Sequence, residues 1–121
     1  MEAPVAVDRG FEGVTAYTLR DHVRLSEALC LASSAVGAGR FADAAVLYEA
    51  YELGLLQHFR IEEELLFPVF EARSGMTNGP TAAMRDEHRQ ARTALGIMRD
   101  GLIRIDAGAY GNGLRRQGDV L

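Results

Sequence analysis

Three segments of this 121-residue chain carry apolar residues at alternating steps of three and four, which constrains the fold more than any other feature. Such spacing puts the residues on one face of an α-helix, and each helix must bury that face against another element. The third segment shows the longest unbroken run, formed by Met84, His88, Ala91, Leu95, Met98, Leu102 and Ile105. The pattern predicts an all-α protein built as a helical bundle.

Glycine and proline residues mark the ends of the predicted helices. Gly37 and Gly39 end the first helix, Gly75 ends the second, and Pro80 suits the first turn of the third. We expect helices at about residues 12–37, 41–73 and 80–105, with Pro68 kinking or fraying the second. Because the connections are short, neighbouring helices should run antiparallel. The prediction is a single domain, residues 1–121, with up-and-down topology.

The tail, residues 106–121, does not continue the pattern and contains four glycines. We therefore expect three long helices, with the fourth helix of the bundle missing or rudimentary. Such an incomplete bundle would leave an open apolar groove, and exposed apolar patches usually meet a partner. Self-association is the simplest solution, so the sequence predicts a homo-oligomer.

Composition excludes several classes of protein. The net charge of −4 is small and evenly spread, which argues against a nucleic-acid partner. No stretch reaches the roughly 18 to 20 apolar residues of a membrane span. The lone cysteine, Cys30, cannot form an internal disulfide, and we expect it to be a small buried residue. A cytoplasmic location is the resulting expectation.

The only three histidines of the chain, His22, His58 and His88, all lie on the apolar faces, one in each predicted helix. Buried imidazoles without partners cost free energy. Glu62 follows His58 by four residues, so both side chains leave the same helix face. A buried carboxylate is costly unless it is paired or bound to a metal, and this donor set suits iron, manganese or zinc. We expect these four residues to form a metal site. The alternative is a hydrogen-bonded polar core without metal.

The sequence around these residues resembles the hemerythrin-like, HHE cation-binding family over about residues 14–105. The resemblance is carried by Asp21-His22, by the pattern His-Phe-x-x-Glu-Glu-x-x-Leu-Phe-Pro at residues 58–68, and by Glu87-His88. It implies a four-helix bundle of hemerythrin type around a non-haem di-iron centre. In that centre His22 and His58 would ligate one iron, Glu62 would bridge the pair, and His88 would ligate the second iron. Without the fourth helix, the alternatives are that the chain binds one iron or none.

Two departures from the family pattern narrow the functional expectation. Arg92 stands where oxygen-carrying hemerythrins have a second histidine one turn after the third-helix histidine, and no histidine follows His88. We expect a non-haem iron protein that binds dioxygen or a related small ligand, or that serves redox-linked iron binding or sensing. We do not expect an enzyme. One alternative is a ferroxidase-like enzyme, which needs more core carboxylates. The other is a metal-free interaction module that dimerises through its open groove.

Overall fold

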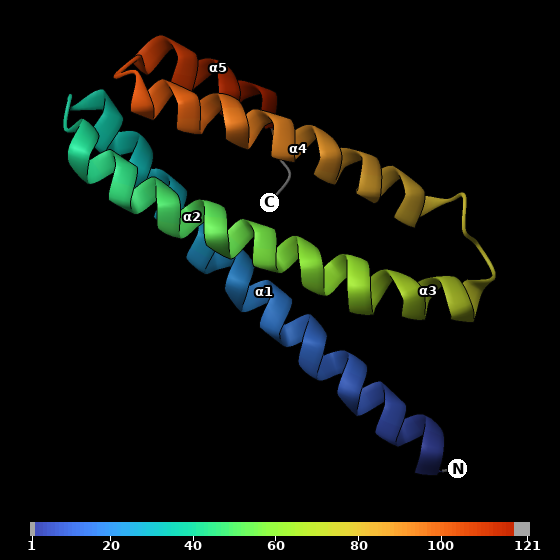
Figure 1. Cartoon of the computed structure of the whole chain (residues 1–121). Helices are drawn as coiled ribbons and strands as arrows, with labels where there is room; N and C mark the ends of the chain where they lie inside the picture. The colour runs from blue at the N-terminus through green and yellow to red at the C-terminus, as the bar shows by residue number, and fades with distance from the viewer. Residues whose placement is uncertain (1, 118–121) are drawn as a thin grey trace.

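The computed structural model describes the backbone of residues 2–117 and the side chains of residues 20–117 (Figure 1). The elements in chain order are α1 (Glu2–Gly37), α2 (Phe41–Ile61), the π-helical turn η1 (Glu62–Leu66), α3 (Phe67–Ser74), α4 (Pro80–Ile103) and α5 (Ala107–Gln117). Residues 2–117 contain no β-strand. The predicted all-α class is confirmed. Within the same residues, no helix is both long and apolar enough to cross a membrane.

The helices pack mainly as two antiparallel hairpins, α1 against α2 and α4 against α5. α2, η1 and α3 follow one another without a break, so residues 41–74 form one rod, along which α4 lies (Figure 1). α1 begins at Glu2, well before the expected residue 12. Its N-terminal end diverges from the other helices in Figure 1.

The expectation of a missing or rudimentary fourth helix is wrong, because α5 forms an eleven-residue helix that folds back along the C-terminal end of α4. Asp106 starts it, since its Oδ1 accepts a hydrogen bond of 3.0 Å from the backbone N–H of Ala109. The glycines that obscured the helix in the sequence allow close packing. A Cβ on Gly113 would lie 2.6 Å from Met98 Cγ and 2.8 Å from the carbonyl oxygen of Ala94.

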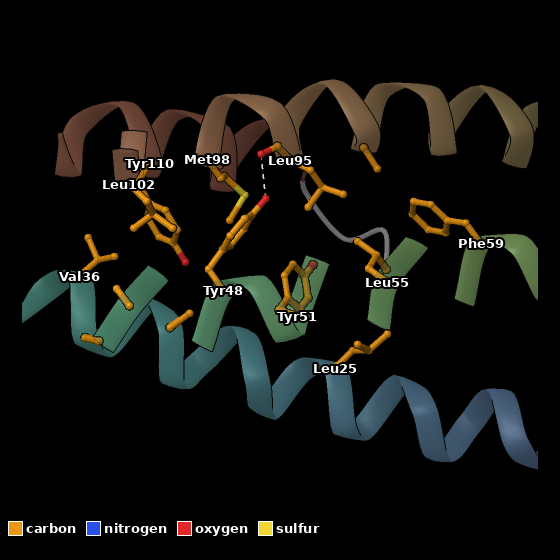
Figure 2. Packing of buried hydrophobic residues seen from close by; sticks show 14 residues of the cluster. Leu25, Val36, Tyr48, Tyr51, Leu55, Phe59, Leu95, Met98, Leu102 and Tyr110 are labelled. Carbon is orange, nitrogen blue, oxygen red and sulfur yellow. Dashed lines mark hydrogen bonds between the residues drawn. The ribbon is translucent and has the colours of Figure 1, made fainter. Parts of the chain in front are cut away.

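Large side chains from α1, α2, α4 and α5 fill the core (Figure 2). The largest fully buried ones are Tyr51, Phe59, Leu25, Leu55, Leu95 and Met98. Two hydrogen bonds cross the core: the Tyr48 hydroxyl donates to the Leu95 carbonyl oxygen at 2.7 Å (dashed in Figure 2), and the Ser33 and Tyr110 hydroxyls lie 2.8 Å apart. These contacts tie α2 to α4 and α1 to α5.

A π-helical turn stands where the sequence predicted a kink near Pro68. Proline has no N–H to donate to the residue four positions earlier, and its ring crowds that carbonyl. The helix widens before Pro68, and the Phe67 N–H bonds to the Glu62 carbonyl oxygen, five residues back. The extra residue shifts all later side chains around the helix. A regular α-helix would place Leu65, three residues after Glu62, on the buried face, but Leu65 is exposed and Phe67 is buried.

Two further burial predictions are wrong. Ile105 is 68% exposed because α4 ends at Ile103 and Ile105 adopts a left-handed backbone conformation in the connection to α5. Cys30 is exposed because the buried face of α1 runs through Leu25, Ala32 and Ala35. Cys30 lies off that face.

Candidate metal centre

Glu62, the first residue of η1, brings two histidines of different helices together. Its Oε1 lies 3.1 Å from His88 Nε2 of α4 and 3.6 Å from His58 Nε2 of α2. The side chains of all three residues are largely buried, with exposed fractions of 13% for Glu62, 8% for His58 and 4% for His88. Three of the four residues expected from the sequence therefore meet at one carboxylate oxygen.

A second carboxylate contacts the far nitrogen of each imidazole. Asp21 Oδ2 of α1 lies 3.2 Å from His58 Nδ1, and Glu63 Oε2 lies 2.6 Å from His88 Nδ1. An ionised carboxylate only accepts hydrogen bonds, so each Nδ1 donates. This arrangement fixes the orientation of both rings and directs both Nε2 atoms toward Glu62. Carboxylates commonly orient metal-binding histidines in this way.

Aromatic rings hold His88 from the sides. The Phe59 ring stacks on the imidazole with centroids 3.9 Å apart and planes 15° apart, and the Phe67 ring lies 5.6 Å away at 25°. Arg92 lies over Phe59, and Arg85 lies over Phe67. The two phenylalanines of the 58–68 pattern thus restrain the ring that Glu62 and Glu63 orient.

The electrostatics of the site centre on His88. Burial alone would lower the pKa of His88, but its hydrogen bonds and charge interactions with Glu62 and Glu63 outweigh burial, so the pKa is raised above its ordinary value. Burial would raise the pKa of Glu63, but Arg92 and His88 outweigh it and hold that pKa below its ordinary value. Glu63 therefore favours its ionised form, and the neighbouring His88 ring favours protonation.

The structure does not bring His22 to the other three residues. It is partly buried on α1, next to Asp21, and makes no hydrogen bond or ion pair with a residue between 20 and 117. Over those residues, no group of three or more His, Cys, Asp or Glu side chains is arranged as a preformed metal site. Glu62 instead contacts His58 and His88 directly.

The donor set nevertheless fits a divalent metal such as iron. A metal bound to imidazole nitrogen and carboxylate oxygen at about 2.0–2.2 Å holds neighbouring ligand atoms about 3.0–3.4 Å apart. The Nε2–Oε1 separations of 3.1 and 3.6 Å are close to that range. Two imidazoles and one carboxylate suit iron and similar divalent metals, whereas soft metals favour sulfur ligands.

The sequence interpretation missed Asp21 and Glu63 as partners of the site. Asp21 lies four residues before Leu25 on the buried face of α1, so helical spacing could have found it. Three-and-four spacing places Glu63 off the face that holds His58 and Glu62, and so predicts a solvated residue.

Comparison with known proteins gives one match. The model of the hemerythrin HHE cation binding domain matches residues 16–117, which include His22, His58, Glu62 and His88. No curated protein and no solved structure matches the chain.

Proposed function

Since this chain belongs to the hemerythrin HHE cation-binding family, we propose that it binds iron at His58, Glu62 and His88. The observation that supports this most directly is the convergence of two imidazole Nε2 atoms on one carboxylate oxygen. His22 is a candidate fourth ligand, because it follows Asp21 on the helix that faces His58. Iron bound there would supply reversible binding of dioxygen or a related small ligand, or a change of oxidation state.

The residues of the chain have distinct parts in this proposal. His58 and His88 donate Nε2, while Asp21 and Glu63 keep the proton of each ring on Nδ1. Glu62 offsets part of the positive charge of the ion. Phe59 and Phe67 shield His88 from water and restrict its rotation. We propose binding rather than turnover, because the two further carboxylates face Nδ1 atoms and not the point shared by Glu62 and the Nε2 atoms.

Metal analysis of the purified protein, with a visible spectrum before and after exposure to air, tests the proposal. The Glu62→Gln variant keeps the shape of the side chain and removes its charge, so we expect it to lose iron. Glu64→Gln is the matched control, since Glu64 is exposed on the same turn and pairs only with Arg60 among the described residues. The proposal fails if the wild-type protein, supplied with ferrous iron without air, binds none, or if both variants bind iron equally.

A further inference from the structure

On each flank of the centre, the outer carboxylate that contacts an imidazole Nδ1 also forms an ion pair with an arginine. Arg92 donates from both terminal nitrogens to Glu63, at 3.2 and 3.1 Å. On the opposite flank, Arg24 donates from Nε to Asp21 Oδ1 at 3.0 Å. Each outer carboxylate therefore has a guanidinium on one side and an imidazole Nδ1 on the other, and its charge is already balanced.

Glu62 is different from these two carboxylates. Among the described residues its ion-pair partners are the two imidazoles, and no guanidinium contacts it. In the form that binds a metal both imidazoles are neutral, and each outer carboxylate is balanced by its guanidinium, so Glu62 leaves the cluster with one uncompensated negative charge. One divalent ion changes that net charge to about +1, whereas two change it to about +3, and unbalanced charge in a largely buried site is costly.

A second ion would also lack ligands. Both imidazole Nε2 atoms face Glu62, so a second ion on the α4 side would have to use Glu63, and Arg92 holds both oxygens of Glu63. Arg92 is further restrained because its guanidinium lies 5.3 Å from the centre of the Phe59 ring, which stacks on His88. A cation that took Glu63 would have to displace Arg92 and loosen His88.

We propose that the centre takes one divalent metal ion rather than two, and that the Arg92–Glu63 pair excludes the second. This inference rests on the proposed function, and it departs from the pair of irons that the family resemblance implies. Two imidazoles and one carboxylate leave coordination positions open on a single ion, as in other centres with that donor set. Those positions are where a small exogenous donor would bind.

Titration of the metal-free protein with Co²⁺, followed by calorimetry and by elemental analysis after gel filtration, tests the number of ions. We expect one equivalent for the wild type and the spectrum of an isolated high-spin ion. Arg92→Gln frees Glu63 of its cation, and we expect this variant to take up a second, weaker equivalent. Arg89→Gln is the matched control, because Arg89 lies on the exposed part of the same helix and pairs with Asp86.

The outcomes separate the two proposals. If the wild type takes up no Co²⁺ and no ferrous iron, the proposed function fails. If the wild type takes up two equivalents with magnetically coupled spectra, the protein binds metal but the inference of a single ion is wrong. If Arg92→Gln matches Arg89→Gln in both stoichiometry and affinity, the part assigned to the Arg92–Glu63 pair is wrong.

Discussion

The ring of Phe59 lies flat on the imidazole of His88, with centroids 3.9 Å apart, although the two residues belong to different helices. Phe59 is also 1% exposed and forms part of the main core cluster. The packing of the core and the orientation of a proposed ligand therefore depend on the same side chain. A substitution at this position should change both stability and metal binding.

Phe59→Leu is expected to lower the free energy of unfolding by about 1–3 kcal/mol, because it leaves a small cavity and removes the stacked ring. We also expect metal affinity to fall by about tenfold, since His88 gains rotational freedom. Thermal unfolding with and without metal measures the two effects. Phe70→Leu is the control, because Phe70 is 39% exposed on the same rod. Equal metal affinity in the two variants would contradict a role for Phe59 at His88.

The raised pKa of His88 predicts how the stability of the metal-free protein depends on pH. A group whose pKa is higher in the folded than in the unfolded state stabilises the fold below its unfolded value, here 6.5, and loses that effect as pH rises through the folded value. Metal-free protein should therefore become less stable from about pH 6.5 upward. Glu63 has the opposite sign: its lowered pKa stabilises the fold above its ordinary value and loses that effect in acid.

Urea unfolding of the metal-free protein between pH 5 and pH 9 measures this dependence. The His88→Gln variant keeps a polar side chain of similar size that cannot titrate. The fall in the free energy of unfolding above about pH 6.5 should therefore disappear in this variant. An unchanged slope in the variant would assign the dependence to another group.

Substitution of His22 and of His58 should have unequal effects. His58→Ala leaves Asp21, which is 4% exposed, without its imidazole partner, and such a loss costs about 1–3 kcal/mol. His22→Ala removes a partly buried side chain without a described partner, so the metal-free protein should change by less than about 0.5 kcal/mol. We expect His58→Ala to abolish metal binding and His22→Ala to weaken it. Complete loss of metal in both variants would make His22 an essential ligand, and α1 would have to turn it inward.

The sequence predicted the helical class and the meeting of His58, Glu62 and His88, because helical spacing determines which side chains share a face. It did not predict Glu63, because three-and-four spacing places this residue off the face that holds His58 and Glu62. It misplaced Leu65 because the π-helical turn before Pro68 shifts the following side chains around the helix. Pro68 was a signal for an irregularity, but the sequence could not tell a kink from a widened turn.

The fourth helix was missed for a different reason. Glycine has low helix propensity, so α5 reads as a loop when only local preferences are considered. Its stability comes from packing on α4, where Gly101 and Gly113 allow the two backbones to approach closely. A contact between elements overrides local propensity there, and spacing along one helix does not reveal it.

Substitution of Gly113 and of Gly111 in α5 by alanine should change the free energy of unfolding in opposite directions. A Cβ on Gly113 would lie 2.8 Å from the Ala94 carbonyl oxygen and 2.9 Å from the Met98 amide nitrogen, and these backbone atoms cannot move away independently. Gly113→Ala should destabilise the protein by about 1–3 kcal/mol, because α5 must shift off α4. A Cβ on Gly111 would meet only the flexible end of Arg115, at 3.4 Å. Gly111→Ala should therefore stabilise the protein by about 0.5–1 kcal/mol through helix propensity. Chemical unfolding of both variants measures the difference, and stabilisation by both substitutions would mean that α5 does not pack on α4 in solution.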